Sequence, residues 1–339
     1  MKPSLTPRLG LDLGTWKTAL AVGERILYCE PTVMIADTKT HRVMYTGKAA
    51  AERMGKLAAG SEVLRPVSRG AIADFAATRF HLRKVFSLAM RPPRFLRPMV
   101  AASMPITLNS VEERALCEAA REAGAGQIYL LPSNLASYVS VSNNLNDPRG
   151  SLVIDMGAGT TDISVLASNE IIVGRTLPVG GDDLTARVQR VLEMTFGVET
   201  GWEESMRATI EAGMDTSGDG AIMVKRKYES GETAGFREVK VPYGALAEFI
   251  RQGLEPVIDG IVEVLEETPP ELYEDIFYRG LFVTGGVARL RGLNEYLSSR
   301  LDMKITVLEE PHLSVVRGLG RILREFASFR QFFRHHVTF

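Results

Sequence analysis

Two short glycine motifs, each at the end of an apolar run, constrain the fold of this chain more than any other feature. The first is Leu9-Gly10-Leu11-Asp12-Leu13-Gly14-Thr15, and the second is Leu152-Val153-Ile154-Asp155-Met156-Gly157-Ala158-Gly159-Thr160-Thr161-Asp162. Each pattern indicates a strand, an Asp, a tight glycine turn, a Thr and another strand. A turn with little side-chain bulk lets backbone N–H groups surround a phosphate, while the Asp faces the metal or water on that phosphate. We therefore predict two hairpins that hold a nucleotide tail from both sides.

Composition limits the class of protein. With 339 residues, the chain is long enough for roughly two domains that each bury a core. Apolar residues make up 45% and charged residues 24%, a balance typical of globular proteins, which argues against disorder. Forty basic and 41 acidic side chains give a net charge of −1, so no overall field favours nucleic acid as a partner.

Other features bear on where the protein works. Two cysteines, Cys29 and Cys117, are too few for a disulfide framework or a metal cluster, and we expect both to be buried small hydrophobic residues. No apolar stretch approaches the ~20 residues needed to cross a bilayer. Residues Met1 to Arg8 lack an apolar export segment. The sequence therefore predicts a cytoplasmic protein.

Strand and helix patterns alternate along the chain. Strands are predicted at 18–22, 26–29, 33–36, 43–46, 99–103, 171–177 and 281–283. Helices are predicted at 49–57, 75–89, 110–123, 180–196 and 245–267, the last interrupted near Pro256. Ser110 and Glu113 have the spacing of a capping box. This order indicates two similar α/β halves, with smaller insertions at about 31–61 and 188–245.

A third glycine motif, Leu281-Phe282-Val283-Thr284-Gly285-Gly286-Val287-Ala288, completes a resemblance. Together the three motifs resemble the actin, sugar-kinase and seventy-kilodalton chaperone superfamily and, within it, the MreB family of bacterial actin homologues. The segments that distinguish this family occur in order over about residues 9–325. They are 65–75, Gly124-Ala125-Gly126, Val179-Gly180-Gly181-Asp182, Pro269-Pro270-Glu271-Leu272, Arg279-Gly280 and Arg317-Gly318.

The resemblance implies an actin-like α/β fold. Two lobes, each built on a ribonuclease-H-like subdomain with a smaller insertion, would surround a nucleotide cleft. Lobe I would comprise residues 1–147 and 312–339, with its insertion at about 31–61. Lobe II would comprise residues 148–311, with its insertion at about 188–245.

The resemblance also implies site residues for ATP and Mg²⁺. Asp12 and Asp155 would hold the hydrated metal, and Thr160 would join them in catalysis. Lys17 is either a phosphate contact or part of a solvated face. The full set of implied nucleotide contacts is Gly14, Thr15, Trp16, Lys17, Gly157, Ala158, Gly159, Thr160, Thr161, Gly181, Asp182, Arg207, Gly285, Gly286 and Val287.

Several positions depart from the family pattern. Ser133 stands where the family has the Glu that positions the attacking water, and a serine is a poor substitute for that carboxylate. The ribose-contacting Glu falls on Thr209 and the neighbouring Lys on Arg207, while Val287 and Ala158 each replace a glycine. We expect ATP to bind and its hydrolysis to be slow or lost, which leaves open whether the chain is an enzyme.

Two segments point to a membrane. The basic, proline-rich stretch 91–98 places Phe95 and Leu96 at a loop tip, which suits insertion among anionic headgroups. The alternative is that these two residues begin the next strand. Residues 326–339 are aromatic and basic, and we predict either a membrane-surface or partner-binding tail or docking onto the body.

Our functional hypothesis is a filament-forming protein on the inner face of the cell membrane, with ATP closing the lobes. Its partners would be further copies of itself, the anionic membrane surface, and membrane-bound proteins of cell shape or organelle positioning. The main alternative is a non-polymerising pseudo-ATPase that acts as a membrane scaffold or adaptor. A small-molecule kinase is disfavoured because no Asp general base is evident, and a chaperone because no substrate-binding module follows.

Overall fold

Two β-sheets form the centre of the molecule. The computed structural model describes residues 6–55, 57–89, 97–142, 147–217, 220–230, 233–333 and 335–338. The first sheet has the order β18-β10-β9-β1-β2-β3, and the second has the order β13-β12-β11-β16-β17. The strands of the first sheet are β1 (Arg8–Leu13), β2 (Lys17–Val22), β3 (Arg25–Pro31), β9 (Met99–Met104), β10 (Gln127–Pro132) and β18 (His335–Thr338). Those of the second are β11 (Ser151–Met156), β12 (Thr161–Ala167), β13 (Glu170–Leu177), β16 (Leu281–Thr284) and β17 (Ile305–Val307).

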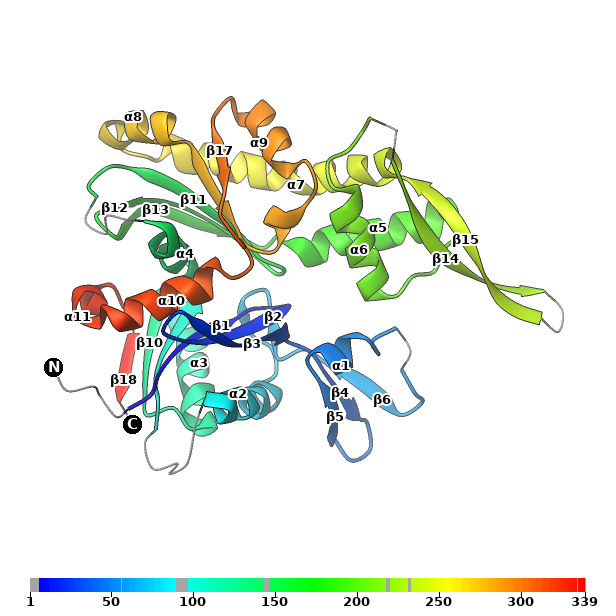
Figure 1. Ribbon diagram of the computed structural model, residues 1–339, viewed down its shortest axis with the longest axis horizontal. Coiled ribbons are helices and arrows are strands. Elements are labelled where there is room, and N and C mark those ends of the chain that lie inside the picture. Colours follow the sequence, from blue (N-terminus) through cyan, green and yellow to red (C-terminus); the bar gives the residue numbers. More distant parts are fainter. Residues whose placement is uncertain are drawn as a thin grey trace.

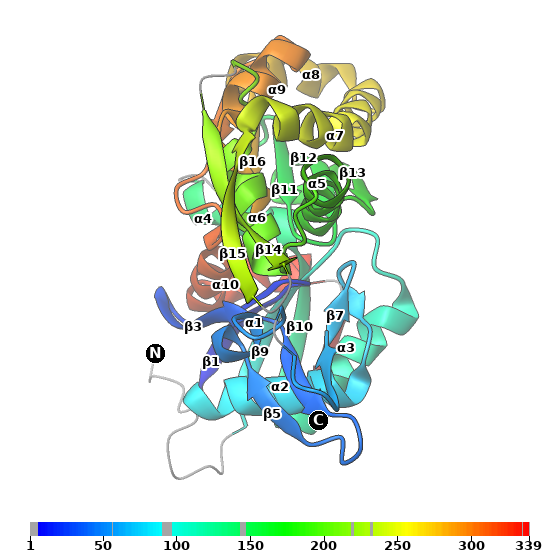
Figure 2. The same ribbon diagram turned by 90° about the vertical axis from the view of Figure 1, so that its right-hand side faces the viewer.

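The two sheets share one plan. In the first, the antiparallel meander β1-β2-β3 is extended on the β1 side by parallel β9 and β10. In the second, the meander β11-β12-β13 is extended on the β11 side by parallel β16 and β17. The predicted actin-like fold with two similar α/β halves is thereby confirmed, and each half opens with one of the glycine hairpins. Figure 2 shows the second sheet and its helices stacked above the first.

Helices cover both sheets. In the first lobe, α2 (Phe75–Ala89) and α3 (Ser110–Ala123) bury apolar faces against one side of the sheet. In the second, α5 (Gly181–Phe196), α6 (Trp202–Ala212), α7 (Tyr243–Glu266) and α9 (Leu293–Leu301) contribute to its core, and α8 (Pro270–Arg279) follows α7. Helix α7 continues through Pro256, so the predicted interruption there is wrong.

Smaller elements project on one side of the molecule (Figure 1). The insertion in the first lobe is the sheet β5-β4-β6 with a short helix, α1 (Lys48–Ala51), and that in the second includes the hairpin β14-β15. Their strands are β4 (Met34–Asp37), β5 (Val43–Thr46), β6 (Ser61–Leu64), β14 (Ala221–Ser230) and β15 (Thr233–Pro242). The remaining short elements are β7 (Val67–Ser68), β8 (Ala71–Ile72), α11 (Phe326–Phe329) and the 3-10 helices Val287–Arg289 and Arg330–Phe332. The exact lobe boundaries stay a prediction.

Helices α4 (Ser133–Val141) and α10 (Ser314–Arg324) lie between the two sheets (Figure 1). Their apolar side chains form one cluster with residues of both sheets, including Leu131 and Val153. The helices approach so closely that a Cβ atom at Gly318 would lie 1.7 Å from the carbonyl oxygen of Ala136. Only glycine fits there, so the Arg317-Gly318 motif sets the spacing of the two helices.

The aromatic carboxyl-terminal segment docks onto the body. Phe329 is fully buried, and the Tyr129 ring lies 4.9 Å from Phe326 and 5.0 Å from Phe333 between centroids. The backbone of β18 then pairs antiparallel with β10. Of the two alternatives for this segment, the docked one is therefore present.

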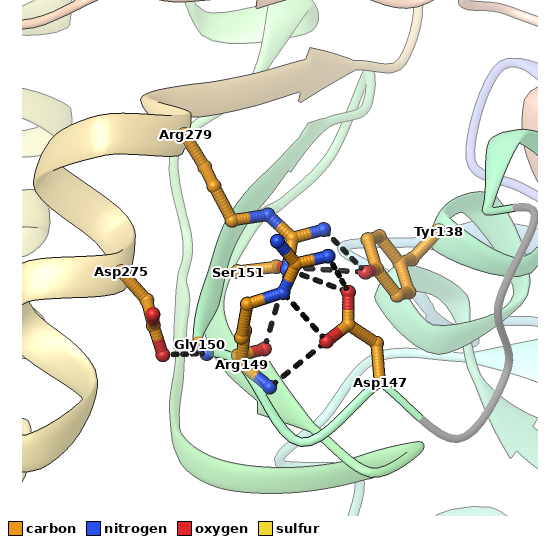
Figure 3. Close-up of polar contacts among 7 residues, drawn as sticks. All are labelled: Tyr138, Asp147, Arg149, Gly150, Ser151, Asp275 and Arg279. Carbon is orange, nitrogen blue, oxygen red and sulfur yellow. Dashed lines mark hydrogen bonds and ion pairs between the residues drawn. The ribbon is translucent and has the colours of Figure 1, made fainter.

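A buried carboxylate ties the lobes together where the chain passes from one to the other (Figure 3). Asp147, which is 7% exposed, accepts hydrogen bonds from Arg149 Nε at 2.9 Å and from Arg279 Nη1 of α8 at 3.1 Å. Arg279 also donates to the Tyr138 hydroxyl of α4 at 3.1 Å. The hydrogen bonds from Arg149, opposed by burial and aided by the nearby Arg279 charge, lower the pKa of Asp147 to about 2.

Replacing Asp147 by Asn removes the charge that both guanidinium groups bind. We expect Asp147→Asn to lower the free energy of unfolding by about 1–3 kcal/mol near neutral pH. Since the folded-state pKa of about 2 lies below the ~3.9 of an unfolded Asp, this stabilisation is present above roughly pH 4 and is lost as the pH falls toward 2.

Urea unfolding of both proteins at neutral pH and at about pH 3 measures this difference. The matched control is Asp259→Asn, which removes an exposed carboxylate from α7. If wild type and Asp147→Asn lose stability in parallel as the pH falls, this account of Asp147 is wrong.

Candidate functional site

A cavity of about 310 Å³ lies between the lobes, where β1 and β11 end. The structure brings together most of the residues that the glycine motifs predicted. The residues that line this cavity include Asp12, Gly14, Thr15, Trp16, Lys17, Ser133, Asp155, Gly157, Ala158, Gly159, Thr160, Gly285 and Gly286. Both predicted carboxylates, Asp12 and Asp155, therefore border the same cavity, as the hypothesis of a shared phosphate site requires.

The two glycine turns have the same backbone geometry. Gly14 N donates to the carbonyl of Lys17 at 2.9 Å, and Gly157 N donates to the carbonyl of Thr160 at 2.9 Å. The turns also touch each other, because a Cβ atom at Gly159 would lie 2.4 Å from Thr15 Oγ1. Glycine at 159 is thus required by the opposite lobe.

Asp12 is paired within its own hairpin. Lys17 Nζ lies 2.6 Å from Asp12 Oδ2, and Ser103 Oγ of β9 donates to Asp12 Oδ1 at 3.0 Å. The Lys17 side chain is 22% exposed. Burial acts to lower the pKa of Lys17, but the charge and hydrogen bond of Asp12 outweigh it and raise that pKa. Lys17 therefore lines the cavity as an ammonium paired with Asp12, and its role as a phosphate contact stays a prediction.

Acidic groups crowd the second hairpin. Burial, followed by the charges of Asp162 and Asp12, raises the pKa of Asp155 to about 7. A hydrogen bond from Ser133 opposes this shift. A raised pKa is the response expected of carboxylates brought close together without enough positive charge.

Asp12 and Asp155 are the predicted ligands of a magnesium ion. Both oxygens of Asp12 already accept hydrogen bonds, one of them from an ammonium. In the described part of the chain, no three His, Cys, Asp or Glu side chains are grouped to hold a metal. Lys17 would repel a divalent ion, whereas the carboxylates of Asp155 and Asp162, which line the same cavity, would attract it. The acidic lining as a whole therefore suits a cation, and Asp12 and Asp155 as ligands of Mg²⁺ stay a prediction.

Ser133 begins α4 and faces the acidic groups. Its hydroxyl lies 3.4 Å from Asp162 Oδ2 and also hydrogen-bonds Asp155. Toward Asp162 the Ser133 hydroxyl acts as the donor. The next residue, Asn134, donates from Nδ2 to the carbonyls of Val153 and Asp162, which anchors α4 to the second sheet.

Five predicted contacts lie outside the cavity lining. Thr161 Oγ1 donates to the carbonyl of Val179, and Gly181 N donates to that of Gly157, so both support the second turn. Arg207 pairs with Glu204 and Glu211 of its own helix and donates to the Met223 carbonyl. Val287 is buried in the second core, and Asp182 binds Arg65. As direct nucleotide contacts these five stay predictions without support from the geometry.

Arg65 and Arg69 make contacts between the two lobes that the sequence did not predict, and we call these contacts the clasp. The Arg65 guanidinium lies 5.5 Å from the Trp16 ring centroid and 4.9 Å from that of Trp202, and it pairs with Asp182 Oδ2 at 2.8 Å. Arg69 pairs with Asp183 of α5 at 3.1 Å. The only sequence signal was the family segment 65–75, which contains both arginines.

Two other lining residues were also missed. Arg289 follows the third glycine motif, and His312 precedes α10. Burial, then the charges of Arg289 and Lys17, lowers the pKa of His312, so it is neutral near neutral pH, and its Nδ1 atom is buried without a hydrogen-bond partner. No local pattern marks either residue, since only the fold brings 289 and 312 together.

The predicted membrane residues Phe95 and Leu96 lie outside the described residues. Among the helices that the structure describes, none combines the length and the apolar character needed to cross a bilayer. The membrane hypothesis therefore depends on the sequence alone.

Comparison with known proteins shows the family of this chain. A family model described as MreB/Mbl protein matches residues 6–331. The cell shape-determining protein Mbl of Bacillus subtilis is 29% identical over 321 residues, which cover 93% of this chain and 95% of that protein. MreB5 of Spiroplasma citri bound to AMPPNP matches with a TM-score of 0.88 and 24% identity over 97% of this chain and 99% of that one. The MamK double helical filament matches with a TM-score of 0.77 and 19% identity over 94% and 99%. On this fold and this match, the chain belongs to the MreB/Mbl family of actin-like cytoskeletal proteins.

Proposed function

We propose that this chain binds ATP between its lobes and polymerises into filaments at the inner face of the cell membrane. The observation that carries the proposal is the single cavity bordered by both glycine turns, Gly14–Thr15 and Gly157–Thr160. Backbone N–H groups in such turns suit phosphate oxygens. The structure of the MreB5 relative holds AMPPNP, which supports a nucleotide here. Asp12 and Asp155 would hold the Mg²⁺ ion that accompanies the phosphates, since carboxylates from both lobes border the cavity.

Self-association follows from the same family. The MamK relative forms a double helical filament, and this chain has its fold over nearly the whole length. A nucleotide that contacts both turns favours the closed arrangement of the lobes, and a polymer that accepts only this arrangement selects it. Assembly would thereby respond to nucleotide.

Membrane attachment is proposed from the stretch 91–98. Phe95 and Leu96 would insert among headgroups, and each flanking arginine would add roughly 1 kcal/mol of attraction to anionic lipid. Cell-shape or organelle-positioning proteins at the same membrane would be further partners.

Slow or absent hydrolysis is proposed from Ser133. A carboxylate that positions the attacking water can take up its proton, whereas the neutral Ser133 hydroxyl is a far weaker base and directs its one proton to Asp162. Thr160 remains beside the cavity, but a threonine does not replace a lost carboxylate. Filaments of this chain would then persist.

The adaptor alternative has one observation in its favour. Arg65 connects the lobes through Trp16 and Trp202, and Lys17 pairs with Asp12. A protein that stays closed in this way could bind a membrane without polymerising.

Sedimentation separates the two functions. We expect the chain to pellet with ATP, to pellet further with anionic vesicles, and to stay in the supernatant without nucleotide. Replacing Phe95 and Leu96 together by Ser should remove the vesicle-dependent part alone, because polymer contacts are left in place. The control is Leu88→Ser, an exposed apolar side chain on α2. Vesicle binding with no polymer in any nucleotide would favour the adaptor.

Restoring a carboxylate at 133 tests the account of hydrolysis. We expect Ser133→Glu to raise phosphate release by about tenfold or more, with Ser133→Gln as the uncharged control. Because the new carboxylate would lie close to Asp162, the gain should be fullest in the double variant Ser133→Glu with Asp162→Asn. Wild-type phosphate release as fast as filament assembly would contradict slow hydrolysis.

A further inference from the structure

The clasp lies beside the cavity. Trp16 directly follows the first glycine turn, lines the cavity, and packs against a cluster of the first insertion that includes Ile35 and Ala50. Trp202 begins α6 in the second lobe, and its ring centroid lies 6.4 Å from that of Trp16. The guanidinium of Arg65 contacts both rings, at 5.5 and 4.9 Å from their centroids. A single side chain of the first lobe therefore connects an indole of each lobe.

The same arginine is bound to the support of the second glycine turn. Arg65 Nη1 donates to Asp182 Oδ2 at 2.8 Å. Asp182 lies in the first turn of α5, and its backbone N donates to the carbonyl of Ala158 at 2.8 Å. Because Trp16 adjoins the first glycine turn and Asp182 is hydrogen-bonded to the second, Arg65 links the immediate neighbours of both turns.

The clasp separates more easily than the contact at the linker. The side chains of Arg65 and Asp182 are 28% and 25% exposed, whereas that of Asp147 is 7% exposed. A partly exposed ion pair costs less to separate than a buried one. A ligand that contacts both glycine turns is enclosed by the two lobes, so it passes in or out when the lobes part. Opening of the lobes at this side has to break the contacts of Arg65.

We propose that Arg65 keeps the lobes closed over the cavity and thereby sets the rate at which nucleotide enters and leaves. The inference rests on the proposed ATP binding and adds the control of nucleotide exchange. Arg65 acts through Trp16 and Asp182, so it is a positioning residue. A lysine at this position would keep the charge that binds Asp182 but lose the planar group that stacks on both rings.

Stopped-flow exchange of a fluorescent ATP analogue, N-methylanthraniloyl-ATP, tests the proposal at protein concentrations too low for polymer. We expect Arg65→Gln to release the analogue about tenfold faster than wild type. Entry should also be faster, and the affinity should change by less than about threefold, because a gate is passed in both directions. Arg65→Lys should give intermediate rates. The matched control is Arg53→Gln, which removes a guanidinium 4.5 Å from the Tyr45 ring centroid and should leave both rates within about twofold of wild type.

Tryptophan emission gives a second measure of the clasp. Trp16 and Trp202 are the two tryptophans of the sequence, so the emission of the protein comes from this site. Acrylamide should quench this emission more strongly in Arg65→Gln than in wild type or in Arg53→Gln, because both indoles lose the guanidinium that covers them.

The other outcomes overturn the proposal. Exchange of the analogue at wild-type rates in Arg65→Gln would do so while ATP binding stands. Faster release with unchanged entry would mean that Arg65 strengthens binding and does not control opening. Quenching equal to that of wild type would mean that the clasp does not depend on Arg65. If wild type does not bind the analogue, the proposed function and this inference fail together. Should Arg65→Gln not fold, as judged by circular dichroism, Trp202→Leu removes one of the two rings and should give the same faster exchange.

Discussion

The contact between the two glycine turns fixes the geometry on which the rest of the site depends. Gly159 meets Thr15 and the backbone of Arg69 from the opposite lobe, and a Cβ atom there would lie within 2.4 to 2.9 Å of them. Since no side chain fits, this one glycine determines how near the lobes come and hence the depth of the cavity between them.

This closeness has an electrostatic consequence. It brings Asp12 of the first lobe near Asp155 and Asp162 of the second, and burial raises the free energy of the charged form of Asp155. Lys17 offsets one charge, and Asp162 gains hydrogen bonds from Ile106 N and Thr176. Asp155 has the least compensation and therefore the raised pKa. The same compression that shapes a phosphate site thus creates its demand for cations.

The sequence predicted the fold well because each local signal agreed with the global one. Apolar runs ended in glycine turns, and the same plan recurred in both halves. The direction in which each side chain points was harder to predict from the sequence. From Thr160 into β12, successive side chains alternate between faces, so Thr160 and Asp162 line the cavity while the Thr161 hydroxyl donates to the Val179 carbonyl. A motif written as letters does not show this alternation.

Boundaries and long-range partners were also beyond local signals. Helix α3 is capped by Asn109 with Glu112, one residue before the predicted Ser110 and Glu113, because both pairs fit the same spacing. Arg289 and His312 carry no motif, and only the fold places them at one cavity.

The contacts that cross between the lobes differ in what their loss would cost. The clasp uses exposed or half-buried groups, with Arg65 28% and Arg69 55% exposed, and such ion pairs contribute little free energy. At the linker, Asp147 is buried, so removing its partners would leave an uncompensated charge. Between the clasp and Asp147, helices α4 and α10 pack closely at Gly318. Separation of the lobes should therefore cost less free energy at the clasp than at Asp147.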